Sequence, residues 1–94
     1  MEESIALMFD KCALTKGRLR LFFYDDAVKI INECKSRRVK LLGIDSFKIS
    51  ARGIQPFMEY SYDYSDLDMI ETWDKAYHDI SRLKDSELVF EIVF

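Results

Sequence analysis

The sequence predicts an α+β domain with a mainly antiparallel sheet of three to four strands packed with two or three helices. Three observations carry this prediction. Two segments repeat apolar residues at three- and four-residue steps, which is typical of amphipathic helices. Two extended runs are joined by a short loop that contains glycine, which is typical of an antiparallel hairpin. The final run, residues 87–94, is largely apolar on both faces, as in a strand inside a sheet.

The chain begins with two short segments whose patterns are weaker. Residues 4–14 fit the period of a helix and also that of a strand, and we expect a helix there. Residues 18–23 alternate arginine with apolar residues before two phenylalanines and predict a short strand. A helix follows over residues 26–37, with Asp25 as its N-cap. The predicted inner face of this helix consists of Ala27, Ile30, Ile31 and Cys34.

Two extended runs, residues 39–50 and 54–62, form the predicted hairpin, and residues 51–53 form its loop. Pro56 lacks an amide hydrogen, so the second strand either begins after it or lies at an edge there. Strict alternation directs one set of side chains toward the core, namely Ile54, Met58, Tyr60 and Tyr62. The opposite face carries Gln55, Phe57, Glu59, Ser61 and Asp63.

The clearest element is a helix over residues 66–84. Ser65 is suited to cap its N-terminus, and Asp68 stands three residues on, where a capping box places an acid. Asp66 and Glu71 complement the positive end of the helix dipole. An apolar stripe that would face the core consists of Met69, Ile70, Trp73, Ala76, Tyr77, Ile80 and Leu83.

The chain has 94 residues, which predicts a single domain over residues 1–94. Its longest apolar run, residues 5–9, is far shorter than the roughly 20 residues that span a bilayer. The start is acidic where a secretory signal would be basic, so we expect a cytoplasmic protein without a membrane segment. Cys12 and Cys34 are too few for a disulfide framework or a zinc site, and we expect both to be buried.

The net charge of the chain is -3, but basic and acidic residues are concentrated in different segments. Residues 11–52 hold eleven Lys or Arg against four acids, whereas residues 53–74 hold six acids and no base. The two blocks either pair with each other across the fold or leave one of them open to a partner. The second possibility would make the acidic block a binding surface.

The chain offers no set of residues that is typical of an active site. Its only histidine, His78, lies four residues after Asp74 on the long helix, which predicts a surface ion pair first. The glycines stand alone and form no phosphate loop, and no serine lies in a nucleophile elbow. Residues 63–68 carry three carboxylates but lack the glycine and final glutamate of a calcium loop. We therefore expect no enzyme, no cofactor and no metal site.

The acidic segment suits a basic protein surface better than a nucleic acid. A pI near 5.1 argues against direct nucleic-acid binding. Carboxylates accelerate encounter with a basic surface, and interleaved aromatic side chains supply apolar contacts. Nuclease active-site clefts are basic surfaces of this kind. The predicted partner-binding residues are Phe57, Glu59, Asp63, Asp66, Asp68 and Glu71.

Several short motifs, taken together, have a family resemblance. They are Gly43-Ile44-Asp45-Ser46-Phe47-Lys48-Ile49, Gln55-Pro56, Asp63-Tyr64-Ser65, Trp73, Ala76 and Phe90-Glu91-Ile92-Val93. With these motifs the chain resembles small immunity proteins of bacterial polymorphic toxin and contact-dependent growth inhibition systems. The likeness covers residues 27–94, and residues 1–26 have no counterpart.

The resemblance implies a cytoplasmic protein without enzymatic activity. Such a protein binds the C-terminal toxic domain of its cognate toxin, often a nuclease, and blocks the active site or a nearby surface. It implies no particular binding residue, because the interfaces of such families diverge widely. We expect this function, and a monomer rather than a homodimer. The alternative is a structural or regulatory subunit that pairs with another copy or another protein through an apolar sheet face that includes Leu42, Val89 and Val93.

Overall fold

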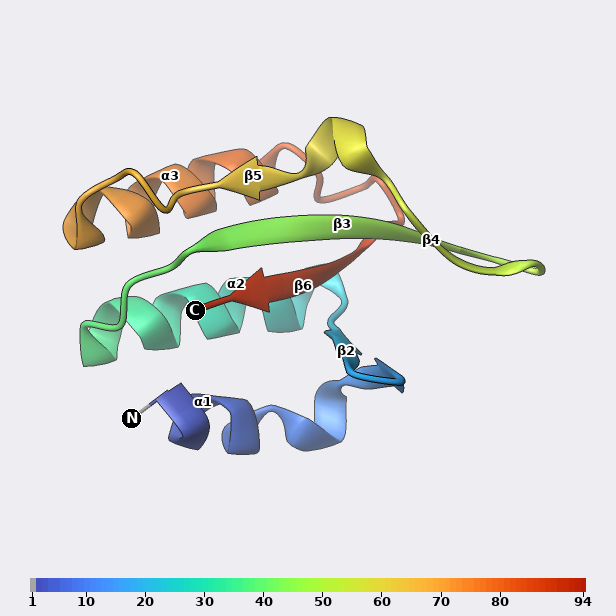
Figure 1. Cartoon of the computed structure of the whole chain (residues 1–94), viewed down its shortest axis with the longest axis horizontal. Helices are drawn as coiled ribbons and strands as arrows, with labels where there is room; N and C mark the ends of the chain where they lie inside the picture. The colour runs from blue at the N-terminus through green and yellow to red at the C-terminus, as the bar shows by residue number, and fades with distance from the viewer. Residues whose placement is uncertain (1) are drawn as a thin grey trace.

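The computed structural model describes residues 2–94, with side chains from Ile5 onward. The expectation of no secretory signal depends on the acidic residues among residues 1–4. These residues lie outside the described side chains. The elements follow in the order α1 (Glu2–Met8), η1 (Asp10–Cys12), β1 (Leu14–Lys16), β2 (Leu19–Leu21), α2 (Tyr24–Arg37), β3 (Gly43–Ser50), β4 (Gly53–Pro56), η2 (Met58–Tyr60), β5 (Tyr62–Asp63), α3 (Met69–Ser81) and β6 (Val89–Val93) (Figure 1). This is the predicted α+β fold with antiparallel strands.

Strand β3 is the centre of a four-stranded sheet. It pairs antiparallel with β6 along one edge, and with β4 and then β5 along the other. Beyond β6, a single bridge between Phe22 and Phe90 joins the end of β2 to the sheet. Strands β1 and β2 form a separate antiparallel pair. The predicted hairpin and the predicted final strand are therefore confirmed.

Helices α2 and α3 pack against each other on one face of this sheet (Figure 1). The main core lies between them and the sheet, where Ile44 and Phe90 are fully buried. The indole Nε1 of Trp73 donates a hydrogen bond of 2.8 Å to the carbonyl of Val39. Because this bond joins α3 to the segment that leads into β3, it fixes the helix relative to the sheet.

The opposite face of the sheet is covered only in part. A small second core joins Leu21 of β2 to Phe47 and Val89 of the sheet. Leu42, at the other end of the sheet, keeps 41% of its surface exposed. Val89 is therefore buried within the chain, and the apolar face expected for a subunit contact is smaller than predicted.

The boundaries of both predicted helices differ from expectation. Helix α3 begins at Met69 with Asp68 as its N-cap, so the prediction of Ser65 as N-cap is wrong. The reason is local, since the amide of Ser65 donates to the side chain of Asp63 at 2.9 Å and holds a turn there. Helix α2 begins at Tyr24 after Phe23, earlier than the predicted Asp25 cap.

The second strand of the hairpin ends at Pro56, where the prediction continued it to residue 62. After the proline, the amide of Phe57 donates to the carbonyl of Ser46 at 2.8 Å, and the chain then turns through η2. Pairing with β3 resumes only in β5. The alternation assumed for residues 54–62 is therefore wrong beyond Pro56.

The first part of the chain is helical up to Met8, which confirms that expectation for residues 4–8. Ile5 and Phe9 turn into the main core. Of the two cysteines, Cys34 is buried as predicted, whereas Cys12 is exposed at the end of η1. Within residues 2–94, no helix is both long and apolar enough to cross a membrane.

Candidate protein-binding surface

The predicted acidic residues lie in sequence along one side of the molecule. Figure 1 shows this stretch of chain passing from η2 through β5 to the start of α3, along the edge of the sheet that β6 does not occupy. We define the acidic edge as the five carboxylates of Glu59, Asp63, Asp66, Asp68 and Glu71. All five residues are exposed. The acidic edge therefore presents a row of negative charges to solvent.

The basic half of the chain does not neutralise this edge. The ion pairs within the described side chains are Arg20–Asp10, Lys35–Asp74, Arg37–Glu33 and Lys75–Asp79. None of them includes a carboxylate of the acidic edge. Among the six acids of residues 53–74, only Asp74 has a basic partner, and that pair is highly exposed with 3.8 Å between the charged atoms. Exposed pairs of this kind contribute little to stability.

One cation borders the acidic edge from another part of the chain. The Nζ of Lys40 donates a hydrogen bond of 3.0 Å to the backbone carbonyl of Ser65. Its charge therefore lies beside the turn between Asp63 and Asp66. The sequence pattern could not reveal this neighbour, because Lys40 lies 25 positions before Ser65 in the chain.

Asp63 has a fixed orientation within the acidic edge. Its Oδ1 accepts the backbone N–H of Ser65 at 2.9 Å. This hydrogen bond lowers the pKa of Asp63, because it stabilises the ionised carboxylate. Asp63 is therefore charged at neutral pH, and the hydrogen bond holds its carboxylate in a fixed position.

Phe57 differs from its predicted role as an exposed apolar contact. Its ring stacks on that of Tyr60 with 5.5 Å between centroids, and it packs against the main core. The exposed apolar side chain at this position is Met58, with 74% of its surface accessible. The alternation pattern directed Met58 inward, but η2 turns it out toward solvent. Pro56 was the one sequence signal that the alternation would not continue.

Tyr60 and Tyr62 pack against the main core, as predicted, and Tyr64 is buried in it. Tyr62 and Tyr64 have nearly parallel rings with centroids 6.5 Å apart. The hydroxyl of Tyr64 donates to Oδ2 of the buried Asp79 at 2.8 Å, and Lys75 lies 3.5 Å from the other oxygen of that carboxylate. Burial, together with the hydrogen bond to Asp79, raises the pKa of Tyr64. This contact holds the chain after β5 against α3 and so supports the acidic edge from within.

The predicted ion pair between Asp74 and His78 is not formed. Asp74 is turned toward Lys35 of α2 instead, across the groove between the two helices. Within the described residues, no three His, Cys, Asp or Glu side chains are grouped so that they could hold a metal ion. Comparison with known proteins finds no family model that matches the chain, and no curated protein or solved structure that is significantly similar to it.

Proposed function

We propose that this chain is an immunity protein, which binds a cognate bacterial toxin domain and neutralises it by occlusion without catalysing a reaction. The acidic edge is the proposed contact surface, and a basic nuclease domain is the proposed partner. The observation that carries the proposal is that the five carboxylates of the acidic edge form no ion pair within the described side chains, in a domain that contains many cations.

Electrostatics and rigidity both support this use of the surface. A row of open carboxylates lowers the energy of a cationic partner as it approaches and so raises the association rate. Asp63 is fixed by Ser65, and the following Tyr64 is fixed by Asp79, so the edge loses little freedom when it is bound. Met58 adds an exposed, adaptable apolar side chain beside Glu59.

The double variant Asp63→Lys, Asp66→Lys tests the proposal directly. The proposal requires a large secreted protein encoded beside this chain, and the C-terminal domain of that protein is the probe. We expect at least about a hundredfold weaker binding, with much of the loss in the association rate, because two attractions become repulsions. Higher salt should shrink the difference between the variant and the parent chain. Cells that produce the toxic domain should survive with the parent chain and die with the variant.

A matched control changes the charge equally at another place. The double variant Asp25→Lys, Asp85→Lys reverses two acids that line a shallow pocket outside the acidic edge. It should remain folded by circular dichroism and bind the toxic domain within about threefold of the parent chain. Equal losses in both double variants would mean that net charge matters and the acidic edge does not.

The second candidate function is a structural or regulatory subunit that acts through homo- or hetero-oligomerisation. The observations that favour it are that Leu42, just before β3, is exposed and that Val93, on the sheet face that the β1–β2 pair covers in part, is half-buried. In this case the open sheet face would be the contact, and the acidic edge would be only a solvated surface. The association state of the protein in solution separates the two functions.

A further inference from the structure

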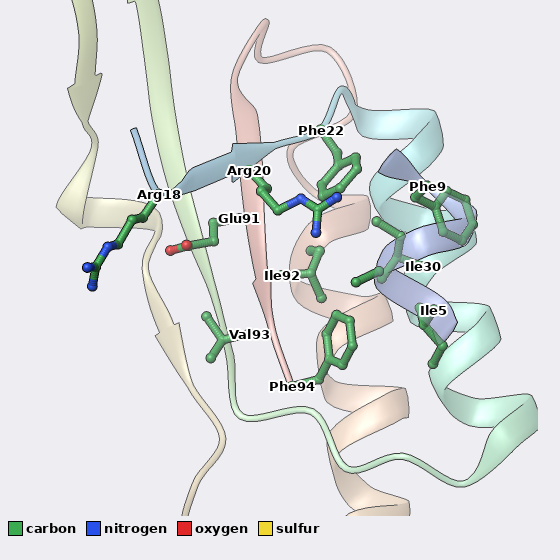
Figure 2. A pocket seen from close by; sticks show the side chains of 11 residues that line it. Ile5, Phe9, Arg18, Arg20, Phe22, Ile30, Glu91, Ile92, Val93 and Phe94 are labelled. Atoms are coloured by element: carbon green, nitrogen blue, oxygen red, sulfur yellow. The ribbon is translucent and has the colours of Figure 1, made fainter. Parts of the chain in front are cut away.

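A second concave site lies at the opposite edge of the sheet from the acidic edge. It is a cavity of about 350 Å³ between α1 with the following Phe9, the β1–β2 hairpin, α2 and β6 (Figure 2). This volume lies within the range of small-molecule sites. Because β3 separates β6 from β5, the cavity is independent of the proposed toxin contact.

The lining of this cavity is mainly apolar. The apolar side chains that lie close together in Figure 2 come from α1, the residue after it, the residue after β2, α2 and the C-terminal end, namely Ile5, Phe9, Phe22, Ile30, Ile92 and Phe94. The rings of Phe9 and Phe22 meet edge to face with 6.5 Å between centroids, which gives the wall a fixed shape. Ile5, Phe9, Phe22, Ile30 and Ile92 keep at most 8% of their surfaces accessible, so the hydrocarbon chain of a ligand would contact only the parts of these side chains that the cavity leaves open.

One charged group extends over this apolar lining. Figure 2 shows the guanidinium of Arg20 directed toward the side chains of Phe22 and Ile92, whereas Arg18 and Glu91 are directed away from them. Arg20 is paired with Asp10 of η1, and the two side chains keep 37% and 59% of their surfaces exposed. An exposed ion pair is worth little, so an anion from a ligand can replace Asp10 at small cost.

We propose that this cavity binds a small amphiphilic carboxylate, such as a medium-chain fatty acid. The hydrocarbon chain lies against the six apolar side chains, and the carboxylate takes the place of Asp10 on the guanidinium of Arg20. Charge complementarity selects this ligand class, because among the three charged lining residues the guanidinium of Arg20 is the one directed toward Phe22 and Ile92, and a guanidinium can bind a carboxylate with two parallel hydrogen bonds.

Titration with octanoate, followed by methyl NMR, tests the site. We expect saturable shifts of the methyl signals of Ile5, Ile30 and Ile92 with a Kd near or below about 1 mM. Across hexanoate, octanoate and decanoate, each added methylene should lower the Kd about fourfold, which corresponds to about 0.8 kcal/mol, until the cavity is full. Shifts that stay linear with concentration, or that do not depend on chain length, would overturn the proposal.

Two variants that break the same ion pair should have opposite effects. Arg20→Gln removes the carboxylate partner and should weaken octanoate binding about tenfold, whereas Asp10→Asn removes the competitor and should strengthen it severalfold. Loss of the Arg20–Asp10 pair is common to both variants, so any damage to the fold would act in the same direction in each. Equal changes in the two variants would contradict the proposal.

Two controls define the contribution of charge. The uncharged analogue 1-octanol should bind with the same affinity to Arg20→Gln, Asp10→Asn and the parent chain, because it makes only the apolar contacts. Lys16→Gln removes the same charge from the same hairpin at an exposed residue that does not line the cavity, so it should change octanoate binding less than about twofold. A loss in Lys16→Gln equal to that in Arg20→Gln would show only nonspecific attraction of an anion.

Discussion

Individual side chains at the residue scale determine how firmly the acidic edge is held. Tyr64 and Asp79 form a buried polar contact between the chain after β5 and α3, and Asp45 and Glu91 face each other across β3 and β6. The first contact is satisfied by a hydroxyl donor. The second brings two acids together, and burial followed by the charge of Asp45 raises the pKa of Glu91. Loss of the hydroxyl group of Tyr64 should therefore lower the stability of the fold, whereas loss of the charge of Glu91 should raise it.

Tyr64→Phe should destabilise the protein by about 1–3 kcal/mol, because the buried carboxylate of Asp79 loses its hydroxyl donor while the ring stays in place. Urea unfolding followed by circular dichroism measures the change. Tyr77→Phe is the control, since Tyr77 lies on α3 as Asp79 does but is half exposed, and it should alter stability by less than about 0.5 kcal/mol. Equal effects of the two substitutions would mean that the contact with Asp79 does not contribute.

Glu91→Gln should stabilise the protein at pH 7, by less than about 1 kcal/mol because the side chain is only half-buried. The folded pKa of Glu91 lies above the unfolded value, so the folded state binds the proton more tightly. Ionised Glu91 lowers the stability of the folded state. This loss is absent below pH 4.5, the unfolded pKa, and appears as the pH rises through the folded pKa of Glu91. The gain of the variant, measured by urea unfolding at several pH values, should disappear toward pH 4. A gain that is constant with pH would contradict this explanation.

At the element scale, the position of β5 depends on one glycine of β3. A Cβ atom on Gly43 would lie 2.6 Å from the carbonyl oxygen of Tyr62, which is too close for any real contact. The glycine therefore permits β5 to approach β3, and the two strands pair at only two positions. This short pairing positions Asp63 in the acidic edge.

Gly43→Ala should destabilise the protein by about 1–3 kcal/mol, because β5 must move away to make room for the methyl group. Hydrogen exchange should show the change locally, with faster exchange at the amide of Tyr64, which donates to the carbonyl of Leu42 at 2.9 Å. Lys48→Ala, an exposed position on the same strand, should leave this amide unchanged. Protection that persists at Tyr64 in Gly43→Ala would show that β5 does not need the glycine.

Periodic elements could be predicted from the sequence, and their ends could not. The apolar stripes identified α2 and α3, because burial on one side of a helix imposes this repeat. The glycine-containing loop identified the hairpin that includes β3, and apolar residues on both faces identified β6. The start of α3 was misplaced because Asp63 competes locally for the amide of Ser65. The acidic edge was predicted from the charge pattern. Met58 lies beside it because η2 turns the chain, and Lys40 lies beside it through a contact with Ser65, so no local sequence pattern could predict these two neighbours.

At the scale of the whole molecule, the two edges of the sheet carry different chemistry. One edge ends in β5 and carries the row of carboxylates, and the other ends in β6 beside an apolar cavity with Arg20. The β1–β2 pair covers part of the remaining sheet face, so the exposed apolar area around Leu42 is small. A stable interface buries roughly 800 Å² per partner. Leu42 and Val93, without the flanking polar side chains, supply much less apolar area than this.

We therefore expect the protein to sediment as a monomer of 11.1 kDa at micromolar concentration. Analytical ultracentrifugation measures this directly. A stable dimer that Leu42→Asp or Val93→Asp dissociates would favour the subunit function over the immunity function. A monomer whose sedimentation does not change in these variants is the outcome that the immunity function requires.

The unequal burial of the two cysteines has a practical consequence. Cys12 is exposed at the end of η1, and Cys34 is enclosed in the core. A thiol-reactive dye should therefore modify the native protein at a single position, with no engineering of the chain. The dye would sit two residues from Asp10, where its fluorescence can report the exchange of one anion for another on Arg20.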